Sequence, residues 1–439
     1  METMSIIGIV LGLSFMMFLA FKGISIYIYG PLSAAIVILT GGMPFWSSLT
    51  GVYMDGFVGY IKNFFLLLML SAIFAKIMGD SGAAQVIAMT IAKLAKKSKK
   101  HKELVAIFSI HAIVLLLTYG GISLFVVTFL IVSIAKTTYQ ELDIPWHLER
   151  AGSWATGTVT MSMLPGSPAA QNLLPIPYLG TTPSAAPIIG LSCAILCAAL
   201  EITYVTHAWR KTKKRGEGFL PTGAAIARRD ITVELKNTDI TIFKALTPSV
   251  VLIFVLNFLP IPSVLVALLV AIAVATVLFW KNLPNIFGSF AAGAEQSIGV
   301  TVGVASVVGF GAVVSATPGY AMIIESLDKI PGSPLMKLII AVNVCAGVAG
   351  SASGGLAIGL NSFAQKFMDM GINPQLIHRI ALISSGGLDS LPHSGAVISG
   401  LRVSALTHKQ AYKHVFITNT VIPIIVSIFA LVLASAGIC

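Results

Sequence analysis

The sequence has few charged residues for its length. Only 10% of its 439 residues are Asp, Glu, Lys or Arg, whereas 56% are hydrophobic. A soluble domain carries about 25% charged residues, so this chain cannot cover a surface that faces water. Continuously apolar stretches of about 20 residues recur along it, which is the length and pattern of membrane-crossing helices and not of a β-barrel. The composition therefore excludes a soluble protein and predicts an all-α polytopic membrane protein in a lipid bilayer.

Cysteine and the motifs of common enzymes are also scarce. The cysteines are Cys193, Cys197, Cys345 and Cys439, and no CxxC or Cys/His pattern indicates a zinc site. The sequence contains no Walker A motif and no H-E-x-x-H, and its Gly-rich segments lack the βαβ context of a dinucleotide site. We expect no enzyme activity, no metal site and no cofactor. The first apolar stretch lacks a basic n-region and a cleavage site, so we expect a retained span.

The net charge of +11 is concentrated in two basic segments, 93–102 and 210–215. The positive-inside rule places such segments in the cytoplasm, where they can also contact anionic lipid headgroups. Nothing else in the sequence supports binding to nucleic acid. We therefore expect both segments to be cytoplasmic loops.

Eight stretches have the length and composition of simple spans. They are 4–20, 24–42, 57–78, 184–208, 243–259, 262–280, 288–316 and 412–436. Two longer apolar regions, 104–176 and 336–400, are interrupted by Gly, Ser and Pro. These two regions resemble each other, because the same markers occur in both in the same order. The markers are a Gly-Gly pair (Gly120-Gly121; Gly354-Gly355), a Pro-led turn (Pro145; Pro374), an arginine (Arg150; Arg379) and a Leu-Pro-x-Ser break (164–167; 391–394).

The shared order predicts an internal duplication. With both basic segments in the cytoplasm, an even number of crossings must lie between them, which requires 104–137 to be a re-entrant hairpin. Residues 146–176 then form a broken crossing helix. The second half repeats this with hairpin 336–370 and broken helix 375–400. Each half has five crossings and one hairpin, so the halves are inverted, as in many secondary transporters. We expect repeats at 1–208 and 243–439, a cytoplasmic basic linker at 209–242, and both termini outside.

Irregular backbone in a membrane must be buried in protein or line a water-filled cavity, so we expect the hairpin tips and helix breaks to meet. The second limb of each hairpin is expected to start just after Gly120-Gly121 and Gly354-Gly355, and the second half of each broken helix near Ser167 and Ser394. These helix starts present free N–H groups and the positive end of a helix dipole, with Ser167 as an N-cap before Pro168. Such ends predict a site for a small organic anion without a cationic side chain. The candidate binding residues are Gly120, Gly121, Ser123, Ser167, Gln171, Asn172, Asn343, Ser351, Ser353, Gly354, Gly355 and Ser394. The alternative is that these small residues only allow close helix packing.

Asp389 is the only acidic residue in the centre of a predicted broken helix. A charge within the membrane is costly, so its presence suggests a function. Asp389 could carry a coupling proton or ligate Na+, and His393 could relay a proton. The alternative is that Asp389 only caps a helix end. We expect Arg150 and Arg379 to anchor their segments at the membrane interface rather than pair with a substrate carboxylate.

The segment "GDSGAAQVIAMTIAKLAKK" resembles the Gly-Asp-Ser-Gly-Gly region of the gluconate permease family, within the ion transporter superfamily. "LPGSPAAQN", "SASGGLAIGL" and "SSGGLDSLPHSGAVISGL" occupy positions similar to that family's breaks and second hairpin tip. Two features depart from the pattern: Ala83 replaces the second glycine, and the first break differs from the His- and Pro-rich break of gluconate carriers.

The resemblance implies a homodimeric, elevator-type H+ symporter in a bacterial inner membrane. Relatives of this kind carry sugar acids, hydroxy acids such as 3-hydroxybutyrate, or D-serine. The altered break favours a short hydroxy or monocarboxylic acid over gluconate itself. The alternatives are a Na+-coupled carboxylate transporter and, from another class, an ion channel or exchanger. A channel predicts a continuous polar stripe on one helix, and the sequence contains none.

Overall fold

The computed structural model is helical throughout the part of the chain that it describes, with no strand there. It describes residues 2–22, 24–96, 101–122, 124–229, 239–259, 264–283, 285–320, 322, 332–392 and 394–439. Within those residues, six helices are long and apolar enough to cross a membrane, and several shorter apolar helices accompany them. The expected all-helical membrane architecture is therefore confirmed.

Two long helices, α4 (Met54–Asp80) and α15 (Ile286–Ser315), form the most extensive contact in the molecule. Glycines let their backbones approach closely, as is common between membrane helices. A Cβ atom at Gly293 would lie 2.7 Å from the Cα of Ile73, and one at Gly56 would lie 2.6 Å from the Cβ of Ala312. The α4–α15 pair is thus a tightly packed centre.

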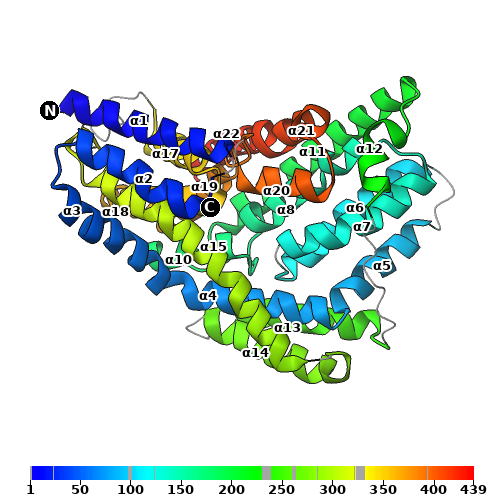
Figure 1. Cartoon of the computed structure of the whole chain (residues 1–439). Coiled ribbons are helices and arrows are strands. Elements are labelled where there is room, and N and C mark those ends of the chain that lie inside the picture. Colours follow the sequence, from blue (N-terminus) through cyan, green and yellow to red (C-terminus); the bar gives the residue numbers. More distant parts are fainter. Residues whose placement is uncertain are drawn as a thin grey trace.

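Two helical pairs flank this centre at opposite ends (Figure 1). The first pair, α1 (Glu2–Phe21) and α2 (Ile26–Thr40), contacts α15 through α2. The second pair, α13 (Ile242–Phe258) and α14 (Val264–Phe279), contacts α4 through α14. Short elements lead into the long helices: α3 (Phe45–Ser47) and the π-helical turn η1 (Ser48–Tyr53) precede α4, and the 3-10 turn η4 (Trp280–Asn282) precedes α15.

Each half of the chain next forms a helical hairpin. The first consists of α6 (Lys102–Tyr119) and α7 (Leu124–Glu141), and the second of α17 (Pro334–Ala349) and α18 (Ala352–Asp369). The two limbs of each hairpin pack against each other. These elements cover the predicted hairpins 104–137 and 336–370, whose re-entrant placement in the membrane stays a prediction. The first hairpin is preceded by α5 (Ala83–Lys96), which packs on α6.

An interrupted helical segment follows each hairpin. The first contains η2 (Trp146–Ala151), α8 (Ser153–Thr158), the π-helical turn η3 (Val159–Met163), α9 (Ala170–Leu173) and α10 (Ile176–Leu179). The second contains α19 (Pro374–Ser385) and α20 (Gly395–Val403). Both interruptions therefore occur where the sequence predicts broken helices.

A long helix ends each half. It is α11 (Pro187–Lys214) in the first half, and α21 (His408–Phe416), η5 (Ile417–Val421) and α22 (Ile422–Ser435) in the second. Helices α11 and α22 pack on each other. The predicted linker 209–242 is partly helical, because α11 continues to Lys214 and α12 (Leu220–Ala227) follows, while residues 230–238 lie outside the described residues.

Side-chain caps account for where several helices begin. Thr241, Asn285 and Ser333 each accept a backbone N–H from the residue three positions later, which satisfies a donor that the helix leaves free. Thr407 and Gln410 form a reciprocal capping box at the start of α21. At the start of α5, Ser81 accepts the N–H of Ala83. The neighbouring Asp80 carboxylate pairs with Lys76 and accepts from Ser289.

Candidate functional site

The first helix break lies between η3 and α9. Leu164 is extended, and Gly166 has φ of +73°, a left-handed conformation that glycine adopts without strain. The Gly166 N–H donates to the Pro183 carbonyl at 3.0 Å. Ser167 Oγ accepts the Ala169 N–H, but Ala169 is still extended and α9 begins only at Ala170. Ser167 is therefore not the N-cap that we expected, and the four-residue α9 is too short to supply a substantial dipole.

The second break separates α19 from α20. Ser394 is the residue before α20, as expected, but its hydroxyl does not cap the helix. Instead Ser394 Oγ donates to the Gly350 carbonyl at 2.9 Å. His393 lies outside the described residues, so its predicted relay role stays a prediction.

The tip of the first hairpin lies where the sequence indicates. Helix α6 ends at Tyr119, and Gly120 and Gly121 form the turn, with φ of +89° at Gly121. The neighbouring Ser123 lies outside the described residues.

The tip of the second hairpin differs from the expectation. The turn is made by Gly350, with φ of +57°, and by Ser351, which caps α18 by accepting the Gly354 N–H. Gly354 and Gly355 are inside the first turn of α18 and are not the tip. A Cβ at Gly355 would overlap the backbone of Ala346, so this glycine serves the close approach of the two limbs.

Each hairpin tip contacts the break of its own half. Tyr119 Oη donates to the Pro165 carbonyl at 3.0 Å, which joins the first tip to the first break. The bond from Ser394 to Gly350 joins the second tip to the second break. The two broken segments also touch, because η3 packs on α19. The structure thus gathers both tips and both breaks into one region, as predicted. The particular hydrogen bonds that join them, from Tyr119 and Ser394, were not predicted from the sequence.

Asp389 lies in the second break, where its Oδ1 accepts the Ser390 hydroxyl at 2.9 Å. Nearby, Asn343 on α17 is buried; its Nδ2 donates to the Ile339 carbonyl, while its Oδ1 has no hydrogen-bond partner among the described residues. A Cβ at Gly387 would overlap that oxygen, so Asn343 Oδ1 faces the backbone of the break. An unpaired buried acceptor is costly, and this one faces Gly387, which precedes the predicted coupling residue Asp389 by two positions.

Other predicted residues are already engaged. Asn172 donates to the carbonyls of Ser167 and Pro183 at 2.8 and 2.9 Å and accepts from Arg379. Ser353 Oγ lies 3.2 Å from Ser351 Oγ. Gln171 is half-buried on α9. Asn172 therefore holds the first break in shape, and the structure assigns no substrate to any of these residues.

Arg379 does not anchor its helix at the membrane interface, contrary to our expectation. Its side chain is fully buried (0% exposed). It donates to Asn172 Oδ1 and to the carbonyls of Pro183 and Ala185 at 3.0 to 3.2 Å. The guanidinium is stable in the protein interior because its several N–H donors bind three acceptors from the first half of the chain at once.

Arg150 is also buried, again contrary to the expectation. It forms a two-pronged ion pair with Glu149, with both N–O distances at 2.6 Å. Ser404, just after α20, donates to Glu149 and accepts the Trp146 indole N–H through its carbonyl. Thus the start of each broken segment is bound to the chain that follows the other break. Glu149, directly before Arg150 in the sequence, was the feature that could have indicated a buried ion pair.

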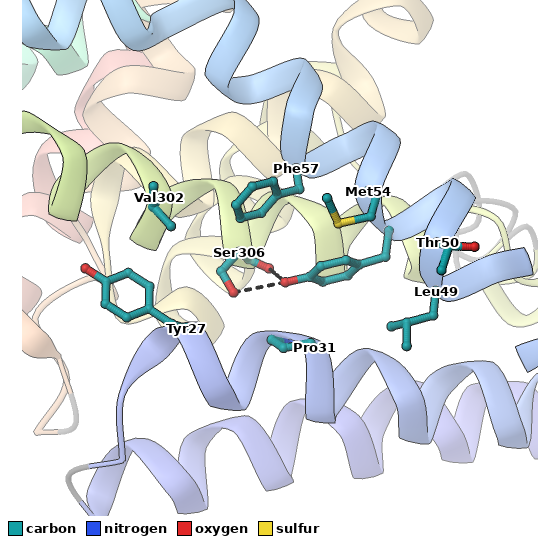
Figure 2. Close-up of a pocket in the computed structure, with 9 residues that line it drawn as sticks. Tyr27, Pro31, Leu49, Thr50, Met54, Phe57, Val302 and Ser306 are labelled. Carbon is teal, nitrogen blue, oxygen red and sulfur yellow. Dashed lines mark hydrogen bonds between the residues drawn. The ribbon is translucent and has the colours of Figure 1, made fainter. Parts of the chain in front are cut away.

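An apolar cavity lies apart from the breaks. Its volume is about 390 Å³, and Tyr27, Pro31, Leu49, Thr50, Tyr53, Met54, Phe57, Val302 and Ser306 line it. Tyr53 Oη lies 3.0 Å from Ser306 Oγ in the cavity wall, and Figure 2 shows Ser306 beside the other lining side chains. None of the predicted site residues lines it. Within the described ranges, no cluster of three or more His, Cys, Asp or Glu side chains could hold a metal ion.

The apolar helices define a multi-pass membrane protein, and two of its segments are interrupted. A solved structure with a similar fold is the YdaH transporter from Alcanivorax borkumensis, described as having an unusual topology. The TM-score is 0.54 with 13% sequence identity, and the match covers 89% of this chain and 88% of that one. This likeness concerns the fold alone.

Residues 4–261 match the family described as GntP family permease. A curated relative, "Uncharacterized transporter YxjC" of Bacillus subtilis (strain 168), is 32% identical, with coverage of 94% of this chain and 95% of the relative. The chain belongs to the GntP permease family, which confirms the resemblance found in the sequence.

Proposed function

We propose that this protein is a secondary active transporter that imports a small organic anion together with H+. The observation that carries the proposal is the gathering of two hairpin tips and two helix breaks into one buried region. Non-helical backbone at membrane depth is tolerated where it lines a substrate path. Membership of a permease family supports the same class of activity.

The proposal includes an inverted repeat of residues 1–208 and 243–439. Matching contacts support it: α2 packs on α15 as α14 packs on α4, and α6 packs on α8 as α17 packs on α19. The buried arginines, Arg150 and Arg379, also occupy equivalent positions at the starts of the two broken segments. In this arrangement the basic segments 93–102 and 209–229 face the cytoplasm of a bacterial inner membrane, and both termini face outside.

The substrate that we propose is a short hydroxy or monocarboxylic acid, with gluconate as the larger alternative. Helices α7 and α18 both begin at the hairpin tips, and each is 18 residues long. Their free N–H groups would attract a carboxylate. Ser351 and Ser353 are half-buried at the second tip and offer hydroxyls to the substrate. The interlocked broken segments and hairpins would move as one body in an elevator mechanism within a homodimer.

Asp389 is the proposed coupling residue because it is an acid in the interior of a broken membrane helix. Na+ coupling is the second candidate. The unpaired Asn343 Oδ1 favours it, because Na+ binds oxygen acceptors, whereas protonation of Asp389 does not require an additional acceptor. An ion channel or exchanger is the candidate from another class. It would conduct without accumulating an organic acid.

The test is uptake into proteoliposomes of a labelled panel that includes gluconate, 3-hydroxybutyrate and lactate. H+ and Na+ gradients are imposed separately, and empty liposomes provide the control. We expect one or more acids to accumulate under the H+ gradient. Accumulation under the Na+ gradient alone would replace H+ by Na+ as the coupling ion, and accumulation under neither gradient would contradict the transporter proposal for this panel.

A further inference from the structure

The side chains of Glu217, His147, His414 and Tyr204 form a continuous chain of polar contacts outside the two helix breaks. His147 Nδ1 lies 2.8 Å from His414 Nε2, and His414 Nδ1 lies 2.8 Å from Tyr204 Oη. At the other end, His147 Nε2 lies 3.5 Å from Glu217 Oε2. The four residues come from η2, α21, α11 and the segment before α12, so they join distant parts of the fold.

The chemistry of the groups allows proton arrangements that differ by one proton. With both imidazoles neutral, Tyr204 donates to His414, His414 donates to His147, and His147 donates toward the Glu217 carboxylate. One added proton lies either on His147, which then donates to both Glu217 and His414 while His414 donates to Tyr204, or on His414, which then donates to both His147 and Tyr204. The heavy atoms can stay in place. A second proton would put two positive rings within hydrogen-bond distance of each other, which is strongly unfavourable.

One end of the chain reaches solvent and the other does not continue. The Glu217 side chain is about one-third exposed (33%) and lines a small cavity with Glu103, Asp143 and Lys213. Tyr204 is half-buried, and in the described part of the chain its hydroxyl bonds to His414 alone. The arrangement is therefore a site with one entrance and not a route across the protein.

We propose that Glu217, His147, His414 and Tyr204 form a site that binds a single proton from the side of the membrane where the basic segments lie. It is separate from Asp389, and the inference goes beyond the proposed transport activity. A proton bound on His147 converts the contact with the Glu217 carboxylate from a hydrogen bond made by a neutral imidazole into an ion pair.

Neighbouring charges and burial determine the pH at which the site takes up its proton. Burial of both imidazole rings opposes the protonated form, as does the Lys413 ammonium beside His414, whereas the Glu217 carboxylate favours protonation of His147. The titratable and charged groups around the four residues are Glu103, Asp143, Glu149, Arg150, Lys213, Arg215 and Lys413. Arg215 lies 3.4 Å from Glu217 Oε1 and competes with His147 for the same carboxylate.

The proton also affects how firmly α12 is held. The backbone N–H of His147 donates to Thr222 Oγ1 on α12 at 3.2 Å. Phe219, directly before α12, packs its ring against Trp146 with the centroids 5.8 Å apart. Because Glu217 lies in the same segment, the ion pair strengthens a third attachment between this segment and η2. We therefore expect acidification to fix α12 more tightly to the broken-helix region.

The experiment is a pH titration of the histidine side chains by nitrogen-15 NMR, on the full chain in lipid nanodiscs with no substrate present. Wild type is compared with Glu217→Gln and His414→Phe, and His207→Gln is the matched control because His207 is an exposed residue of α11. Hydrogen exchange of residues 215–227, corrected for the intrinsic effect of pH, reports how firmly α12 is held.

If the site binds a single proton, the NMR signals of His147 and His414 should change together in one titration step. Glu217→Gln should lower the midpoint by about 0.5 to 1 pH unit, as expected for losing a partly exposed charge partner, and His207→Gln should leave it unchanged. Exchange of 215–227 should slow at acid pH in wild type and not in Glu217→Gln. Independent titration of the two histidines, no proton uptake above pH 5, or an unchanged midpoint in Glu217→Gln would overturn the proposal. None of these outcomes depends on which anion is carried.

Discussion

The guanidinium Nη1 of Arg379 lies 3.2 Å from Oδ1 of Asn172, although the two residues are 207 positions apart in the sequence. Arg379 begins the second broken segment, and Asn172 follows the first break. Two further bonds from Arg379 reach the carbonyls of Pro183 and Ala185. Together with the reciprocal contact of Glu149 with Ser404, these bonds join the two interrupted segments into one unit.

Replacing Arg379 should destabilise this unit. Arg379→Met removes the donor to Asn172 Oδ1 and to the Ala185 carbonyl, while the Pro183 carbonyl keeps Gly166 and Asn172 as donors. We expect a loss of about 3 kcal/mol, as is typical when one partner of a buried charged network is removed. Arg379→Lys should be nearly as harmful because a lysine ammonium cannot match the planar fork. The check is the thermal unfolding midpoint of the purified protein in detergent.

The matched control for Arg379 is Arg402→Lys. The Arg402 side chain is exposed, so we expect the thermal unfolding midpoint of Arg402→Lys to equal that of wild type. An equally stable Arg379→Met variant would show that the arginine does not hold the two segments together.

The Glu149–Arg150 pair should behave differently from a single charge. Glu149→Gln or Arg150→Met alone leaves an unpaired buried ion and should cost about 3 to 5 kcal/mol, whereas the double variant should be more stable than either single one. A double-mutant cycle on unfolding midpoints measures the coupling. Additive effects would mean that the two side chains act independently, against the 2.6 Å contacts between them.

The close approach of α17 and α18 predicts a contrast between two glycines. Gly355→Ala places a methyl group in the backbone of Ala346 and should lower the unfolding midpoint markedly, whereas Gly395 has open space around it. Gly395→Ala should therefore be neutral or slightly stabilising, because alanine favours helix by about 1 kcal/mol. Equal effects of the two substitutions would contradict the packing of the second hairpin.

Much of this fold could be predicted from the sequence because hydrophobic length determines membrane helices. The apolar stretches 57–78 and 288–316 correspond to α4 and α15, and the Gly-Gly marker at 120–121 is the first hairpin tip. The second tip was misplaced, because glycines at a tip and glycines at a close helix contact look alike in sequence. Only the structure distinguishes Gly350, in a left-handed turn, from Gly355 inside α18.

The candidate site could be predicted only in outline. Proline and serine at 165–168 and 392–394 indicated the breaks, but they did not indicate which partner each residue would find. Arg150 and Arg379 were expected at the interface because an arginine near the end of a membrane segment usually extends to the headgroups. Their burial depends on acceptors that the other half supplies, and contacts between such distant residues cannot be recognised from local sequence.

The central claim is that substrate movement is coupled to an ion at Asp389 in the second break. The most direct measurement compares wild type, Asp389→Asn and the exposed control Asp369→Asn in proteoliposomes, using an acid that wild type accumulates. The account predicts that Asp389→Asn equilibrates the acid without concentrating it, while Asp369→Asn accumulates it like wild type. Full concentrative uptake by Asp389→Asn would contradict the account and remove Asp389 from the coupling mechanism.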